Sequence, residues 1–279
     1  YFISAADILE VDGSFGAAVL FGGALASGGA SALNHWLDQD IDQKMRRTQG
    51  RPVASLRVTT TQAVTFGSLL TVLAFIVLAM GANLLSGFLA MGGTLLYIVV
   101  YTQWLKRSTV HNIVIGGAAG AMPPLVGWAA VTGGLDLPAL YLFGIIFFWT
   151  PPHFWALSLL AHGEYEKAGV PMLPVTHGAK VTRNQILFYT ILLVPLALLP
   201  VLTGLGGWIY GATALALGLV FLGYAVRVWR SNAGDAEASG ADMKLARGMF
   251  FFSILYLFLV FAALILEHAA GLHFVIGGV

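Results

Sequence analysis

The stretch TQAVTFGSLLTVLAFIVLAMGANLLSGFLAMGGTLLYIVVYTQ, residues 61–103, decides the fold of this chain. It contains two apolar runs, 61–80 and 84–103, separated by a Gly-Ala-Asn turn at 81–83. Each run has the length of about 20 mostly apolar residues that a helix needs to cross a bilayer. Glycine and asparagine between two such runs are typical of a turn. The stretch therefore predicts a hairpin of two membrane-spanning helices.

Apolar runs of this length recur along the whole chain. We predict eight spans, at 14–37, 61–80, 84–103, 111–132, 137–160, 185–204, 208–229 and 248–267. Of the 279 residues, 58% are hydrophobic and only 10% are charged, and the mean hydropathy is +0.83, whereas soluble domains carry roughly 25% charged residues. We therefore predict an all-α polytopic membrane protein, a single intramembrane domain over 1–279 that partners the lipid bilayer and no nucleic acid.

The beginning of the chain and a polar stretch near its end lead to two further expectations. The chain begins at Tyr1 without a methionine, in what looks like the end of an earlier apolar segment. We expect an N-terminal truncation and a ninth helix before Tyr1. Near the C-terminus the polar stretch SNAGDAEASGAD, residues 231–242, resembles a flexible linker.

Charge divides the loops into two sets. All 14 Lys and Arg residues lie in or beside the loops on one side: Lys44, Arg46, Arg47, Arg51, Arg57, Lys106, Arg107, Lys167, Lys180, Arg183, Arg227, Arg230, Lys244 and Arg247. The other side has only acids: Asp7, Glu10, Asp12, Asp136 and Glu267. The positive-inside rule makes the basic side cytoplasmic. Short loops and the lack of a transit segment favour a bacterial inner membrane over a mitochondrial one.

Acidic residues gather at the cytoplasmic end of the first span, in NHWLDQDIDQKMRRTQGRP, residues 34–52. Asn34, Asp38 and Asp42 are spaced i, i+4, i+8, so at about 100° per residue they drift by only about 80° and share one helix face. Asp40 points away from that face. An amide and two carboxylates form an oxygen-rich set that suits Mg²⁺. The chain has no cysteine, so any metal must be held by oxygen or imidazole ligands.

Basic residues follow the acids at once, at Lys44, Arg46, Arg47 and Arg51. Acids that hold a cation beside bases that clamp phosphate oxygens fit a diphosphate. The alternative is a solvated helix end with ordinary i,i+4 pairs. Acids at a membrane boundary favour the functional interpretation.

The pattern N-x-x-x-D-x-x-x-D resembles the UbiA superfamily of intramembrane prenyltransferases. The fuller D-x-D-I-D-x-x-M-x-R-T-x-x-R-P, residues 38–52, is similar to its protohaem IX farnesyltransferase (haem O synthase) branch. The resemblance implies a UbiA-type bundle of nine helices and a Mg²⁺-diphosphate site that faces the cytoplasm. On this chain it implies Asn34, Asp38 and Asp42 as metal-binding and catalytic residues.

A second similar segment is YTQWLKRSTVHNIVIGGAAGAMPPLVGW, residues 101–128. Lys106 and Arg107 lie on the same side of the membrane as the acids, where they contact the diphosphate or only fix topology. The resemblance implies that Asn112, which opens N-x-V-I-G-G, lines the haem or prenyl pocket. The small residues after it allow close approach of a helix or flat ligand, and Pro123 and Pro124 predict a kink.

The third segment, FFWTPPHFWALSLL at 147–160, carries Pro151 and Pro152, which we expect to break the helical ladder inside the membrane. His153 contacts or ligates haem iron, or it is a hydrogen-bonded core histidine. Phe154 and Trp155 suit a porphyrin or an isoprenoid chain, although aromatics at helical spacing also serve packing.

The fourth segment, HGEYEKAGVPMLPVTHG at 162–178, departs from the wider superfamily. Where many members carry a second D-x-x-x-D, this chain has Ala161 and Tyr165. The pair Glu164-Tyr165, followed by A-G-x-P-M-L-P, matches the haem branch instead and argues against a 4-hydroxybenzoate or menaquinone enzyme. Glu164 is the candidate for a second Mg²⁺, Lys167 for a phosphate contact and Tyr165 for the pocket.

The resemblance implies transfer of a farnesyl group from farnesyl diphosphate to a vinyl group of protohaem IX, giving haem O. Haem is then a substrate rather than a cofactor, and a haem A synthase is a possible partner. Three alternatives remain: a UbiA-type enzyme with another aromatic or tetrapyrrole acceptor, a secondary transporter, or a structural membrane subunit. The massing of acids and bases at one face argues against the transporter.

Overall fold

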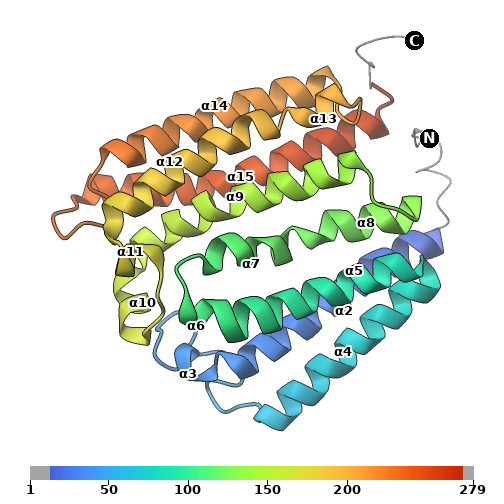
Figure 1. The fold of residues 1–279 in the computed structure, drawn as a ribbon, viewed down its shortest axis with the longest axis horizontal. Coiled ribbons are helices and arrows are strands. Elements are labelled where there is room, and N and C mark those ends of the chain that lie inside the picture. The colour runs from blue at the N-terminus through green and yellow to red at the C-terminus, as the bar shows by residue number, and fades with distance from the viewer. Residues whose placement is uncertain (1–12, 273–279) are drawn as a thin grey trace. The chain divides into compact units, whose positions relative to one another are not determined.

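The computed structural model describes residues 13–272, and every element in this part of the chain is a helix (Figure 1). The elements are α2 (Gly13–Leu37), α3 (Gln39–Asp42), α4 (Thr60–Gly81), α5 (Leu84–Leu95), the π-helix η1 (Leu96–Leu105), α6 (Lys106–Ser108), α7 (Asn112–Gly120), α8 (Met122–Thr132), α9 (Leu137–Leu160), α10 (His162–Ala168), α11 (Leu173–Thr176), α12 (Gly178–Leu196), α13 (Leu199–Leu202), α14 (Trp208–Arg230) and α15 (Gly240–Ala269).

Eight helical segments among the described residues are long and apolar enough to cross a membrane, which confirms the predicted spans. The third span reaches Ser108, the sixth begins at Gly178 and the eighth at Gly240, each beyond its apolar run. The eighth is extended because a capping box satisfies its first turn, with the Ser239 hydroxyl and the Asp242 side chain each accepting from the other's backbone N–H. The expected ninth helix and the acids Asp7, Glu10 and Asp12 lie outside the described residues.

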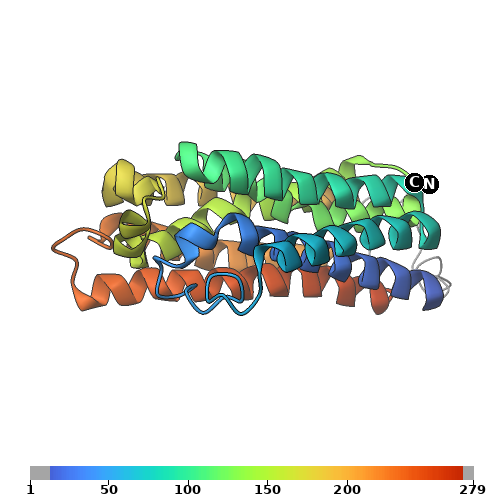
Figure 2. The same ribbon diagram turned by 90° about the horizontal axis from the view of Figure 1, so that it is seen from below.

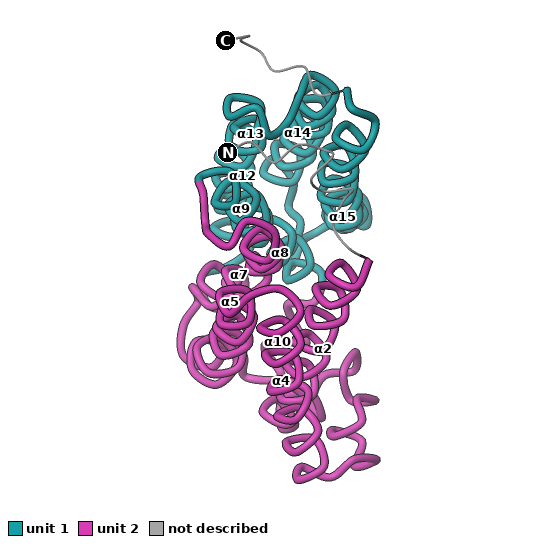
Figure 3. Tube along the Cα trace, turned by 90° about the vertical axis from the view of Figure 1, so that its right-hand side faces the viewer, with its two compact units in different colours: residues 1–11, 137–160, 177–279 teal, residues 12–136, 161–176 magenta. Residues whose placement is uncertain are grey.

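The helices group into two compact units (Figure 3). The described part of unit 1 comprises 137–160 and 177–272, and that of unit 2 comprises 13–136 and 161–176. The single domain expected from the sequence stays a prediction.

In unit 2, α2 packs along α4, and the two helices run side by side in Figures 1 and 2. Glycine allows this approach, since a Cβ on Gly29 would lie 2.8 Å from the Gly67 carbonyl oxygen. The predicted α4–α5 hairpin is present. At its turn the Asn83 side chain accepts from the Ser86 amide at 2.9 Å and donates to the Ala129 carbonyl at 2.7 Å. One asparagine thus caps α5 and fastens the hairpin to the end of α8.

The last spans of unit 2 are irregular where the sequence predicted simple helices. The third span changes from α to π geometry at Leu96, a feature that often marks functional sites. The fourth divides into α7 and α8 at Ala121, just before Pro123 and Pro124, which confirms the kink. Gly116 accepts the ring of Tyr101 directly against its backbone, so small residues here do serve close packing.

Unit 1 is formed by α9, α12, α14 and α15, which lie side by side (Figure 1). Pro151 and Pro152 interrupt the hydrogen-bond ladder inside α9, as predicted, because neither has an N–H to donate, and the helix nevertheless continues from Leu137 to Leu160. Both prolines are buried inside unit 1. At the other end of the unit, buried Glu267 accepts from the backbone N–H groups of Gly207, Ile209 and Tyr210 at 2.7, 2.9 and 3.2 Å, and so caps α14.

The polar stretch 231–242 is not a free linker, contrary to the expectation from its composition. Arg183 of α12 donates to the Ala233 carbonyl at 2.8 Å and pairs with Asp235 at 2.8 Å. Ala233 is buried, and Gly234, with φ of 86°, packs against Leu159. The stretch is therefore anchored to the core of unit 1, and its last residues already belong to α15.

Candidate active site

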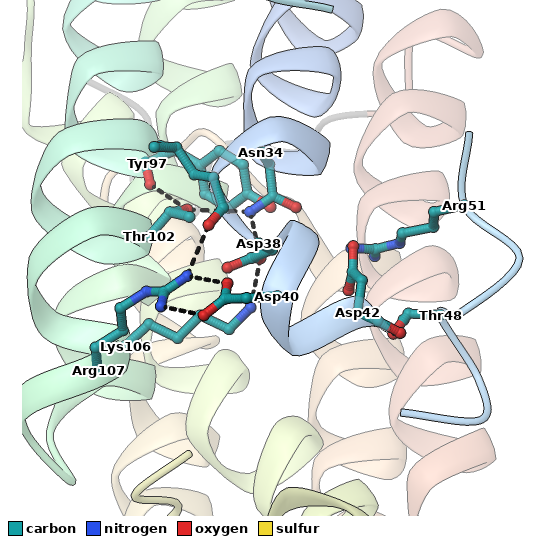
Figure 4. A network of polar contacts seen from close by, with 11 residues as sticks. Asn34, Asp38, Asp40, Asp42, Thr48, Arg51, Tyr97, Thr102, Lys106 and Arg107 are labelled. Atoms are coloured by element: carbon teal, nitrogen blue, oxygen red, sulfur yellow. Dashed lines mark hydrogen bonds and ion pairs between the residues drawn. The ribbon is translucent and has the colours of Figure 1, made fainter. Parts of the chain in front are cut away.

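The predicted acidic cluster lies in unit 2, where the chain leaves the first span. α2 ends at Leu37 and α3 begins at Gln39, so Asp38 stands between two helices, with φ of −94° and ψ of 7°. The i→i−4 backbone hydrogen bonds nevertheless continue, from Asp38 N–H to Asn34 and from Asp42 N–H to Asp38. The spacing predicted one unbroken helix face. The interruption instead leaves Asp38 and Asp42 turned toward different partners (Figure 4).

Asp38 is fully buried, and only one of its two carboxylate oxygens has hydrogen-bond partners. Its Oδ2 accepts from Lys106 Nζ at 2.5 Å and from Asn34 Nδ2 at 2.8 Å. Its Oδ1 is buried without any hydrogen-bond partner. A buried carboxylate oxygen without a donor is costly. Asp38 therefore has one coordination position that a cation would satisfy.

Asp42 is almost fully buried and is matched by an arginine. Arg51 Nη1 donates to both carboxylate oxygens of Asp42, at 3.0 and 2.9 Å. The Thr48 hydroxyl donates to the Asp42 carbonyl at 3.3 Å, which holds the intervening turn. Arg51 approaches from the loop on one side of α3, and Lys106 approaches Asp38 from the other (Figure 4).

Asp40 is exposed, in contrast to the two buried acids, and pairs with Arg107 on the same side of α3 as Asp38 (Figure 4). Arg107 Nη1 and Nη2 reach the Asp40 carboxylate at 2.8 and 2.7 Å, and Nη2 also donates to the Leu37 carbonyl at 2.7 Å. The hydrogen bonds from Arg107 lower the pKa of Asp40. In this state Arg107 closes the end of α2 rather than facing the buried acids.

The π-helix supplies two groups that sequence reasoning missed. Asn34 Nδ2 donates to the Thr102 hydroxyl at 3.2 Å, and that hydroxyl donates to the Tyr97 carbonyl at 2.8 Å. Thr102 and Lys106 thus fix the Asn34–Asp38 pair from the same span. The only signal in the sequence was the run YTQWLKR itself, because the change to π geometry has no clear signature in residue type.

The other predicted residues of unit 2 differ in burial and in their hydrogen-bond partners. Tyr165 is buried on α10, and burial raises its pKa while the hydrogen-bonding Arg47 guanidinium opposes that rise. Lys44 and Lys167 are exposed, and Glu164 is partly buried. Asn112 is fully buried, and both polar atoms of its amide lack a partner. Both atoms would be satisfied by a bound water or by a ligand.

The predicted residues of the third segment lie in unit 1. His153 and Trp155 are buried on α9, and Phe154 meets the His153 ring edge-on, with centroids 5.2 Å apart. The Trp155 indole N–H is buried without a partner.

The donor set fits Mg²⁺. Among residues 13–272 no three His, Asp or Glu side chains converge into a protein-only metal site. The carboxylates of Asp38 and Asp42, with the Asn34 amide, would supply only part of a coordination sphere. That is the usual situation for Mg²⁺, which keeps waters and takes substrate phosphate oxygens. The unpartnered oxygen of Asp38 is the observation that supports the fit.

Comparison with known proteins shows the family of the chain. The model of the UbiA prenyltransferase family matches residues 2–255. The chain therefore belongs to the UbiA prenyltransferase family and is an enzyme of the membrane. This membership favours the enzyme over the transporter and the structural subunit.

The curated relatives narrow that class. The chain is 59% identical over 255 residues to a "Protoheme IX farnesyltransferase" of Hyphomonas neptunium, covering 91% of this chain and 80% of the relative. It is 51% identical over 245 residues to a protein of the same name from Acidiphilium cryptum, covering 88% and 77%. These matches confirm the branch predicted from residues 38–52 and 162–178.

Solved structures share the fold at low identity. A structure of digeranylgeranylglyceryl phosphate synthase aligns with a TM-score of 0.75 and 19% identity, covering 94% of this chain and 88% of that one. A UbiA homolog from Archaeoglobus fulgidus, solved with DMAPP and Mg²⁺, aligns with a TM-score of 0.68 and 15% identity, covering 91% and 89%. The UbiA-type helical fold is thereby confirmed.

Proposed function

We propose that the protein transfers a farnesyl group from farnesyl diphosphate to a vinyl group of protohaem IX, giving haem O. The 59% identity to a protoheme IX farnesyltransferase, spread over 91% of the chain, carries the proposal. The buried acids with their flanking bases supply the chemistry that the proposal requires.

Asn34, Asp38 and Asp42 would hold Mg²⁺, as the oxygen donors and the unpartnered Asp38 oxygen suggest. When bound, the ion would stabilise negative charge on the leaving diphosphate as a Lewis acid. The solved relative that contains DMAPP and Mg²⁺ supports the metal requirement. Glu164 stays the candidate for a second ion.

Lys106 and Arg51 are the cations nearest to the buried acids, because each is already paired with one of them. When a diphosphate enters with its metal, both side chains can exchange a carboxylate oxygen for a phosphate oxygen. Lys44, Arg47 and Lys167 add positive charge from the surrounding loops, and Arg107 joins them once it leaves Asp40. These bases neutralise the leaving group as its charge grows.

The bond changes follow from the substrates. The C1–O bond of farnesyl diphosphate breaks, and diphosphate leaves with the electron pair. The terminal vinyl carbon of protohaem then bonds to C1, which moves the positive charge to the vinyl carbon next to the ring. Water adds to that carbon and loses a proton, giving a hydroxyethylfarnesyl group. Burial of Asn34 and Asp38 places the proposed metal ligands away from bulk water.

The residues predicted for the haem or prenyl pocket stay predictions in each unit by itself: Asn112 and Tyr165 in unit 2, and His153, Phe154 and Trp155 in unit 1. Haem is a substrate in this scheme. A haem A synthase, which would consume haem O, stays a predicted partner.

The test is product formation by the purified protein with Mg²⁺, farnesyl diphosphate and haem, followed by mass spectrometry. We expect haem O and diphosphate in equal amounts. Asp38→Asn should abolish diphosphate release, and the matched variant Asp40→Asn should retain it, because only Asp38 is buried with a free oxygen. Transfer to an aromatic acid such as 4-hydroxybenzoate, with none to haem, would assign the chain to another acceptor.

We further propose that the site faces the cytoplasm of a bacterial inner membrane, which the one-sided distribution of basic residues supports. The cysteine-free chain allows a direct test, since a single introduced cysteine reports its own side. Gln49→Cys should react with a membrane-impermeant maleimide only in inside-out vesicles, and Leu135→Cys only in right-side-out cells. The reverse pattern would place the site on the outer face.

A further inference from the structure

His153 of unit 1 is held between two aromatic rings. The Trp149 ring stacks on one face, with centroids 4.2 Å apart and planes 18° apart, and the Phe250 ring stacks on the other at 4.8 Å and 23°. The Trp149 indole N–H donates to the Ser253 carbonyl at 2.8 Å, which ties α9 to α15 at this level. These two rings fix the plane of the imidazole.

Ser253 determines which imidazole nitrogen carries the proton. The Ser253 hydroxyl lies 2.6 Å from the Phe250 carbonyl, to which it donates its only hydrogen. The same oxygen lies 2.7 Å from His153 Nδ1 and can therefore only accept there. The neutral ring thus carries its proton on Nδ1, and Nε2 keeps an unshared electron pair.

No residue in the range 13–272 bonds to His153 Nε2. The Trp155 indole nitrogen is enclosed by protein and has no hydrogen-bond partner. His153 Nε2 is not one of these enclosed, unpartnered atoms. A core histidine normally uses both nitrogens. An imidazole that donates through one nitrogen to a neutral acceptor and presents the other is the arrangement found in metal-binding histidines.

We propose that Nε2 of His153 ligates the iron of the protohaem acceptor, and that Ser253 is the positioning residue that sets its tautomer and orientation. The inference rests on the proposed function, because haem is the iron-bearing substrate of that reaction. It gives a role to the hydrogen-bonding chain from Phe250 through Ser253 to His153. Iron ligation would hold the porphyrin while its vinyl group reacts.

The test is the optical and EPR spectrum of ferric haem added to the full-length protein in nanodiscs, without farnesyl diphosphate. The wild type should show nitrogen ligation, and His153→Gly should lose it and regain it with added imidazole. Ser253→Ala should bind haem about 10–100-fold more weakly, and Ser253→Thr, which keeps the hydroxyl, should restore affinity. His268→Ala is the control and should match the wild type, since its Nδ1 contacts the Leu264 carbonyl at the far end of α15.

A second measurement needs no variant. Wild-type protein should bind haem at least about tenfold more tightly than metal-free protoporphyrin IX, because only haem offers iron to Nε2. Equal affinity for the two porphyrins, or an unchanged haem spectrum in His153→Gly, would overturn the proposal even if the protein makes haem O. A protein that makes no haem O but shows His153 ligation would instead refute the proposed reaction and leave the haem site standing.

Discussion

Removal of Lys106 tests the electrostatics of the site most sharply. Lys106 is the only cation paired with Asp38 among the described residues, and the Asp38 side chain is 0% exposed. Removing one partner of a buried ion pair leaves an uncompensated charge and typically costs about 3–5 kcal/mol. We therefore expect Lys106→Met to lower the free energy of unfolding by this amount in the absence of ligands. Equilibrium unfolding in mixed SDS micelles would measure it.

The neighbouring exposed pair provides the matched control. Asp40 and Arg107 have side chains that are 58% and 39% exposed, and such pairs contribute roughly 0.2–1 kcal/mol. Asp40→Asn should therefore cost far less than Lys106→Met. The double variant Asp38→Asn/Lys106→Met should be more stable than Lys106→Met alone, because it removes the buried charge together with its partner. Equal losses in Lys106→Met and Asp40→Asn would refute the assignment of a buried, charge-paired Asp38.

Mg²⁺ should act on these variants unequally. In Lys106→Met both oxygens of Asp38 lack a cation, so added Mg²⁺ should restore stability more than it stabilises the wild type. At a concentration about five times its Kd the gain would be about 1 kcal/mol. Asp38→Asn should show a smaller response. A response to Mg²⁺ that is the same in all three proteins would show that the ion binds elsewhere.

Three further predictions use the same unfolding measurement. Gly116→Ala should cost about 1–3 kcal/mol because its Cβ would overlap a tyrosine ring, whereas Gly120→Ala, with nothing within 4 Å, should not destabilise. Glu267→Ala should cost about 2–3 kcal/mol, since it leaves three backbone N–H groups without their acceptor; no loss would exclude the cap. Arg107 lowers the pKa of Asp40 from its ordinary 3.8. The ionised Asp40 therefore adds its full contribution to the free energy of unfolding above pH 3.8, and this contribution is lost as the pH falls through the lowered pKa. Stability should therefore fall more steeply below about pH 4 in the wild type than in Asp40→Asn, by less than about 1 kcal/mol because the pair is exposed; parallel curves would contradict it.

The spans could be predicted from the sequence because burial in lipid needs long apolar runs, and these are visible residue by residue. Helix ends could not, since local hydrogen bonds extend a helix beyond its apolar part, as the Ser239–Asp242 box does at the start of α15. The anchoring of the stretch 231–242 was equally hidden. Its composition is that of a linker, and only its contact with Arg183, which comes from another helix, holds it in place.

In the candidate site, too, contacts between residues close in sequence could be predicted, whereas contacts between residues far apart in sequence could not. Spacing placed Asn34 beside Asp38, because residues four apart in a helical segment are neighbours, but it did not show that Asp42 would turn to Arg51. It did not show that Asp38 would pair with Lys106, 68 residues away, or that His153 would meet Ser253, 100 residues away. Such partners are chosen by helix packing. They matter for the chemistry, because Asp38, the proposed metal ligand, is half of an ion pair with Lys106 in this structure. A sequence motif therefore identifies the acids, and the packing of the third span determines that Asp38 is paired with Lys106 in the absence of substrate.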